Sequence, residues 1–188
     1  MSETGSVEPR ERLRLFVAFR LPDDALRGLT DWQHAELHAP EGVRLVPKEN
    51  LHATIAFLGS RPSEELPDVA NVVREAARAG AGAEPVLTPK RYRETRSVGM
   101  LVFDDEEDRA TRIAEDVHGR LEGLGVYERE KRAWLPHVTV ARFRSPPRLK
   151  PSVPELGAVS PSGVAVYISR LRPGGAQYEV LESVALGG

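Results

Sequence analysis

The stretch Leu51-His52-Ala53-Thr54-Ile55-Ala56-Phe57-Leu58 decides the reading of this chain, because it places a histidine and a threonine in a β-forming run. It follows a turn at residues 47–50 and stops at Gly59, as strands bounded by turn residues do. Side chains alternate between the two faces of a strand, so His52 and Thr54 point the same way. The alternation predicts the opposite, buried face for Ala53, Ile55 and Phe57.

The same pattern returns near the other end of the chain as His137-Val138-Thr139-Val140-Ala141. Both stretches read H-x-T-[IV]-A and both follow a turn region. Two H-x-T patterns arise by accident in roughly one or two of a hundred sequences of this composition, so the repeat carries information. It predicts two strands that each present an imidazole and a hydroxyl side by side.

The remainder of the chain alternates strand and helix patterns, which favours an α+β fold. We expect two pseudo-symmetric mixed or antiparallel sheets with flanking helices around a central cleft, in two similar halves with one histidine-bearing strand each. Residues 1–11 read as a disordered tail, and residues 12–188 as a single bilobal domain. The expected strands are 13–19, 43–46, 51–58, 84–88, 98–103, 134–143, 163–170 and 177–186, and the expected helices are 23–38, 63–79 and 106–123.

The bulk composition excludes several classes of chemistry. The chain has 188 residues and no cysteine, so it holds no disulfide, thiolate nucleophile or zinc–thiolate site. No apolar run approaches the ~20 residues that span a bilayer, and the polar N-terminus does not resemble a signal peptide, which favours a cytoplasmic protein. His34 and His38 have i, i+4 spacing but no evident third ligand, and no phosphate-binding glycine loop is present, so we expect no metal and no cofactor.

Two imidazoles and two hydroxyls on converging strands suit a phosphodiester. One imidazole can be neutral while the other is cationic, since the ordinary histidine pKa is ~6.5. The neutral ring accepts a proton from water, the cationic ring donates one to the departing oxygen, and hydroxyls bind the anionic oxygens. Residues 131–154 contain no acidic side chain, and this local positive charge attracts phosphate despite a net charge of −2.

These motifs resemble those of the two-histidine phosphoesterases, and in particular the RNA 2′,3′-cyclic phosphodiesterase family, also called 2′–5′ RNA ligases. The likeness covers residues 14–18, 46–59, 136–142 and 169–178. It implies that RNA ends or nucleotides with a 2′,3′-cyclic phosphate are opened to 2′-phosphomonoesters without a metal. It also implies that His52 donates a proton, that His137 accepts one, and that Thr54 and Thr139 hold phosphate oxygens.

Two further substrate-binding roles are expected. The resemblance implies that Arg142 binds the phosphate or RNA end, although strict alternation puts it on the face opposite His137 unless the strand has a bulge. Phe19 ends the first expected strand and is a candidate for stacking on a base, with a core position as the alternative.

The sequence leaves other functions open. A nucleotide- or RNA-binding module with little turnover would use the same cleft. A hydrolase of small cyclic phosphates, or a 2′–5′ RNA ligase, would use the same acid–base pair. We expect a monomer with no membrane partner.

Overall fold

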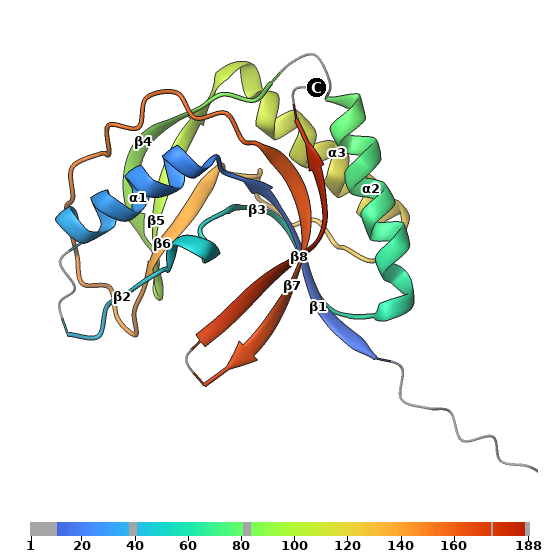
Figure 1. Ribbon diagram of the computed structural model, residues 1–188, viewed down its shortest axis with the longest axis horizontal. Helices are drawn as coiled ribbons and strands as arrows, with labels where there is room; N and C mark the ends of the chain where they lie inside the picture. Colours follow the sequence, from blue (N-terminus) through green and yellow to red (C-terminus); the bar gives the residue numbers. More distant parts are fainter. Residues whose placement is uncertain (1–10, 38–40, 81–83, 174, 187–188) are drawn as a thin grey trace, which may run out of the picture.

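The computed structural model describes residues 11–37, 41–80, 84–173 and 175–186. They form two four-stranded antiparallel sheets (Figure 1). Nearly all of the expected tail lies outside the described residues. The first sheet has the order β3-β1-β7-β8, with bounds Ala53–Pro62, Arg12–Arg20, Gly163–Arg172 and Gly175–Ala185. The second has the order β2-β6-β5-β4, with bounds Arg44–Leu45, His137–Arg142, Val98–Asp105 and Leu87–Glu94.

Among the described residues, three α-helices flank the sheets. Helices α2 (Leu66–Ala79) and α3 (Arg109–Gly123) pack on the first sheet, where α2 contacts β7 and β8 and α3 contacts β3 (Figure 1). Helix α1 (Asp23–Glu36) packs on the second sheet through its buried residues, among them Trp32 and Gln33. Short 3₁₀ turns η1 (Lys48–Asn50), η2 (Ser63–Glu65) and η3 (Glu106–Asp108) precede β3, α2 and α3. Within the residues that the structure describes, no helix is long and apolar enough to cross a bilayer.

The bilobal α+β fold is therefore confirmed, but the lobes do not follow the order of the chain. The first sheet joins strands from both ends of the sequence, and β2 crosses into the second sheet beside β6. One histidine-bearing strand still belongs to each sheet, because β3 follows His52 and β6 begins at His137.

Strand boundaries differ from the expected ones where proline or charge intervenes. The strand expected at 84–88 is β4, which begins at Leu87 after Pro85 and runs on through a half-exposed basic stretch. Polar residues are tolerated there because β4 is an edge strand. Strand β6 begins at His137 instead of Trp134, since Pro136 has no N–H to donate to a neighbouring strand.

Strand β1 separates the main core from the surface that faces the other lobe. Leu15, Val17 and Phe19 are buried in the main core between sheet and helices. Phe16 and Ala18 point the other way and pack in a small aromatic cluster with Ala165, Tyr167 and Tyr178. This second face is the one that carries the candidate site.

Candidate active site

The two histidines are held in the same way. His52 Nδ1 lies 2.7 Å from the carbonyl oxygen of Asn50, and His137 Nδ1 lies 2.7 Å from that of Leu135. In each case the partner is the residue two positions earlier. A carbonyl only accepts, so both Nδ1 atoms carry the hydrogen and both Nε2 atoms are left for a ligand. The matched contacts fix two imidazoles in one tautomer without using their reactive nitrogens.

The two motifs meet across the lobes. The indole N–H of Trp134 donates a 2.9 Å hydrogen bond to the carbonyl of Thr54, which ties the segment before His137 to the strand after His52. The positive charge of His137 acts on His52 and contributes to a lower pKa there. The pattern of burial is also the same in both motifs. The histidine is half-buried, the next residue is buried and the threonine is half-buried, and two buried residues and an exposed one follow. The two histidine-bearing segments are thus in contact, and the two imidazoles are close enough to interact electrostatically.

Each motif contains a β-bulge at the same position. In β6 the partner of Gly99 is Ala141 but the partner of Met100 is Thr139, so Val140 has no residue opposite in β5. In β3, Val17 pairs with Ala56 and Ala18 with Thr54, so Ile55 is unpaired in the same manner. A bulge shifts every following side chain to the other face.

Arg142 and Phe57 occupy equivalent positions after the two bulges, five residues beyond each histidine. Arg142 is exposed, the bulge puts it on the face of His137, and its charge acts on His52. The bulge that its expected role requires is therefore present. Phe57 is 67% exposed and lies opposite Phe16, whose ring packs on His52. The buried position predicted for Phe57 is wrong, because alternation was carried past a bulge.

Buried polar side chains from the helices support both bulges. Gln33 of α1 is 1% exposed and donates to the carbonyls of Val46 at 3.0 Å and Val140 at 2.7 Å. His118 of α3 is 5% exposed, and its Nε2 donates to the carbonyl of Ile55 at 2.8 Å. Each bulged residue thus has its carbonyl bonded by a buried side chain.

Replacing Gln33 with methionine is expected to lower the free energy of unfolding by about 2 kcal/mol, because buried carbonyl oxygens lose donors while the volume is kept. We also expect lower activity, since the Val140 bulge directs Arg142. Urea unfolding checks the first effect, with His34→Met, at an exposed position on the same helix, as the control. Equal stability of the two variants would show that the amide does not support the bulge.

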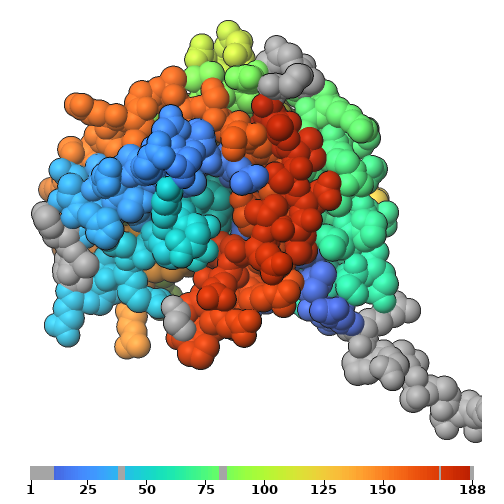
Figure 2. All heavy atoms as spheres, viewed as in Figure 1, coloured from blue at the N-terminus to red at the C-terminus, as the bar shows by residue number. Residues whose placement is uncertain are grey.

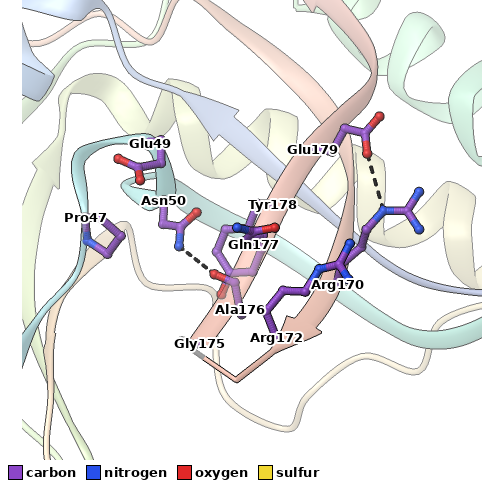
Figure 3. Close-up of a pocket in the computed structure, with 10 residues that line it drawn as sticks. All are labelled: Pro47, Glu49, Asn50, Arg170, Arg172, Gly175, Ala176, Gln177, Tyr178 and Glu179. Atoms are coloured by element: carbon purple, nitrogen blue, oxygen red, sulfur yellow. Dashed lines mark hydrogen bonds and ion pairs between the residues drawn. The ribbon is translucent and has the colours of Figure 1, made fainter.

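Aromatic rings enclose His52 on the first-sheet side. Its ring centroid lies 4.9 Å from that of Phe16, 5.3 Å from that of Tyr178 and 5.8 Å from that of Tyr167. Tyr178 also lines a cavity of about 460 Å³ at the β7–β8 hairpin (Figure 3). There the Asn50 side chain donates a 2.9 Å hydrogen bond to the Ala176 carbonyl, so the residue that orients His52 is itself anchored to the hairpin.

Burial lowers the pKa of His52 to about 4, assisted by the charges of Arg142 and His137, while the hydrogen bond to Asn50 acts in the opposite direction. In the ligand-free protein His52 is therefore neutral at pH 7. The unfolded chain binds a proton here near pH 6.5, and the folded chain binds it only near pH 4. The contribution of neutral His52 to the free energy of unfolding is therefore fully present above pH 6.5 and is lost as the pH falls towards 4.

Unfolding at acid pH is expected to show the loss of stability that accompanies protonation of His52. Between pH 7 and pH 4, His52 should contribute a loss of about 3 kcal/mol in the free energy of unfolding. The variant His52→Gln should lack this component, because glutamine does not titrate. Denaturant unfolding at both pH values measures the difference, and parallel losses in the two proteins would mean that His52 keeps an ordinary pKa.

Phe19 does not lie where a substrate could reach it. Its side chain is 0% exposed and packs in the main core, with its ring centroid 5.8 Å from that of Trp134. Phe19 pairs with Ala53, which faces the same core. The predicted stacking role is therefore wrong: Phe19 is one residue out of phase with Phe16 and Ala18, which face the site.

The other residues considered at the sequence level are more simply placed. Thr54 and Thr139 are half-buried, and Thr54 lies opposite Ala18 on the face of Phe16. His34 is exposed on α1, and His38 lies outside the described residues. Within those residues, no group of three or more His, Cys, Asp or Glu side chains is arranged to hold a metal ion.

Comparison with solved structures gives the class. The fold matches a crystal structure of a Thermus thermophilus protein with a TM-score of 0.76 and 30% identity, covering 94% of this chain and 99% of the other. It also matches E. coli LigT complexed with NADP⁺, with a TM-score of 0.78 and 23% identity over 95% of this chain and 100% of the other. Together with the paired motifs, this fold defines a two-histidine phosphoesterase.

Sequence comparison gives the family. Residues 20–85 match the model described as LigT like Phosphoesterase. A Thermus thermophilus protein named RNA 2′,3′-cyclic phosphodiesterase is 33% identical over 184 residues, which cover 94% of this chain and 91% of that protein. A Methanocaldococcus jannaschii protein of the same name is 25% identical over 182 residues, covering 90% and 99%. The chain belongs to the RNA 2′,3′-cyclic phosphodiesterase family of LigT-like phosphoesterases.

Proposed function

We propose that the chain hydrolyses the 2′,3′-cyclic phosphate at the end of an RNA to a 2′-phosphomonoester, with His52 and His137 as the acid–base pair and without a metal. The observation that carries this proposal is the matched pair of Nδ1 contacts, which leaves two Nε2 atoms available in motifs joined by the Trp134–Thr54 hydrogen bond. The names of the curated relatives support the substrate class.

The reaction needs two proton transfers. His137 Nε2 takes a proton from water as the water oxygen attacks phosphorus, and His52 Nε2 gives a proton to the ribose O3′ as the P–O3′ bond breaks. The product carries a 2′-phosphate and a 3′-hydroxyl. Each group contributes roughly 10²–10⁴-fold when it is positioned for transfer.

His52 must gain its proton when the substrate binds, because it is neutral in the free protein at pH 7. The cyclic phosphate is an anion, and an anion beside the imidazole stabilises the charged ring and raises its pKa. The same anion offsets the charge of Arg142, which lowers that pKa in its absence. Substrate binding thereby turns a neutral histidine into an acid.

The other cleft residues hold the substrate. The hydroxyls of Thr54 and Thr139 donate to non-bridging oxygens, and the Arg142 guanidinium balances the charge that builds up on them. Phe57 replaces Phe19 as the aromatic surface for the terminal nucleoside, since it is exposed and packs against Phe16 beside His52.

Replacing Phe57 with alanine is expected to raise KM for a nucleoside cyclic phosphate by roughly 5- to 150-fold, because stacking on one aromatic ring contributes about 1–3 kcal/mol per base. The value of kcat should change little, since the ring does not touch the reacting atoms. Steady-state kinetics measure both constants, and Phe57→Tyr is the matched control that keeps a ring. A loss confined to kcat would assign Phe57 to the chemistry instead of to binding.

The proposal is tested with a short RNA bearing a 2′,3′-cyclic phosphate, incubated with the protein in excess chelator. We expect complete conversion to a 2′-phosphate end, identified by ³¹P NMR or chromatography against the 3′-phosphate isomer. Binding without turnover would instead indicate an RNA-binding module. Loss of turnover in chelator, restored by a divalent metal, would contradict the metal-free mechanism.

A further inference from the structure

A second open pocket, of about 640 Å³, lies where β2 meets the end of β6, and its lining is rich in arginine. Arg44, Arg142 and Arg144 contribute to it, together with Ser97, Phe143 and a single acidic lining residue, Glu41. Figure 2 shows the surface hollowed between the red β7–β8 hairpin and the cyan and orange segments that include β2 and β6. The segments that include β2 and β6 form one wall of this hollow, and the hairpin forms the opposite wall.

Two of these arginines form a like-charge pair. Arg44 and Arg142 are directly opposite each other in the β2–β6 ladder, so their side chains emerge on the same face. Like charges directly opposite across a pair of strands are destabilising. In the part of the chain that the structure describes, no acidic side chain forms an ion pair with Arg44, Arg142 or Arg144. The charge of this pocket therefore favours an anion.

Arg142 links the arginine pocket to the candidate active site. Arg142 lines the pocket, and its charge also acts on His52. Arg144 follows two residues later, with the buried Phe143 between them fixed by a 3.0 Å hydrogen bond from its N–H to the Ser97 carbonyl. The three arginines therefore share one pocket, with Arg44 opposite Arg142 across the two strands and Arg144 two residues further along the chain.

We propose that Arg44 and Arg144, beyond Arg142, bind the backbone phosphate on the 5′ side of the terminal nucleotide, so that the site is built for RNA ends and not for single nucleosides. This rests on the proposed function. A nucleoside whose 2′ and 3′ oxygens carry the cyclic phosphate is joined to the rest of the RNA only through its 5′ oxygen. The next anion along the substrate is consequently that 5′ phosphate.

The opposite wall is less suited to a phosphate. At the β7–β8 hairpin, Arg170 is paired with Glu179 at 3.4 Å, and Glu49 lines the same cavity (Figure 3). The charges there are balanced, whereas the Arg44 side has three cations and one acid. Charge therefore directs the strand along β2 and β6.

The test compares kcat/KM for adenosine 2′,3′-cyclic phosphate, the same compound with a 5′ phosphate, and a short RNA with that end. In the native protein the two substrates with a 5′ phosphate should be preferred by roughly 10- to 100-fold, as expected for charge-assisted hydrogen bonds. In Arg44→Ala/Arg144→Ala this preference should fall to within about twofold, and the salt dependence for RNA should weaken. Arg172→Ala, on the hairpin wall, and Arg78→Ala, on α2, should both retain the preference.

Each other outcome has a distinct meaning. Equal kcat/KM for all three substrates in the native protein, or an unchanged preference in the double variant, overturns the proposal that Arg44 and Arg144 bind the 5′ phosphate. Either result leaves the proposed function intact. Loss of the preference in Arg172→Ala alone overturns it by placing the strand on the hairpin. A native protein that turns over none of the three substrates overturns the proposed function itself, and this proposal with it.

Discussion

Replacing His137 with alanine is expected to lower kcat/KM on a nucleoside 2′,3′-cyclic phosphate by roughly 10²–10⁴-fold, because the attacking water loses its proton acceptor. His52→Ala should cause a loss of the same order, since O3′ would leave as an alkoxide. The double variant should be little slower than either single one, because groups that act as a unit are not additive. Steady-state kinetics on one substrate measure all three.

The matched control is His34→Ala, because His34 is an exposed histidine on α1 and belongs to neither motif. It should retain native kinetics. Thermal unfolding at pH 7 separates lost chemistry from lost structure, since among the described residues each of the two imidazoles is hydrogen-bonded to a nearby carbonyl. Near-native turnover by the double variant would refute the acid–base role of the pair.

Replacing Arg142 with glutamine is expected to lower kcat/KM by roughly 10²–10³-fold, because the developing negative charge on the phosphate loses its fixed counter-charge. The same change should raise the pKa of His52 from about 4, since the charge of Arg142 helps to lower it. We expect this one substitution to change both the activity and the His52 pKa, because the bulge at Val140 turns Arg142 towards the histidines.

NMR titration of the His52 ring measures the second effect without any substrate. Arg78→Gln, which removes an exposed arginine from α2, is the control of equal charge and should leave the His52 pKa unchanged. If Arg142→Gln also left it unchanged, Arg142 would not face His52, and its place beside the cyclic phosphate would have to be abandoned.

Sequence reasoning succeeds here wherever the information is local. Alternation is enough to put His52 with Thr54 and His137 with Thr139, because each pair is separated by one residue and precedes the bulge. The repeated pattern is also enough to predict two related strands. Which strand joins which sheet is not local: β2 joins the lobe of β6 although only a short turn separates it from β3.

The positions of Phe57 and Arg142 show where alternation fails. A bulge depends on the register with a partner strand, here β1 or β5, and on side chains from distant helices that bond the unpaired carbonyl. None of these partners is visible within the motif. The motif does contain a signal, since Ile55-Ala56 and Val140-Ala141 place two apolar residues in succession in an otherwise alternating strand. Both members of each pair are buried.

The stacking role predicted for Phe19 is wrong for a related reason. An aromatic residue at the end of a strand beside a predicted site is compatible with either face, and only the pairing with β3 decides between them. Phe19 lies opposite Ala53, on the core side, whereas Phe16 lies opposite Phe57, on the side of His52. A one-residue difference in phase therefore separates a core residue from a site residue.

The pH dependence of kcat, measured for the native protein, His52→Ala and His137→Ala, tests most directly whether both rings exchange protons with one substrate. The native profile should be bell-shaped, His137→Ala should lose the acidic limb, and His52→Ala should lose the basic limb. Either variant showing both limbs of the native curve would contradict the mechanism, and an exchange of the limbs would reverse the roles of donor and acceptor.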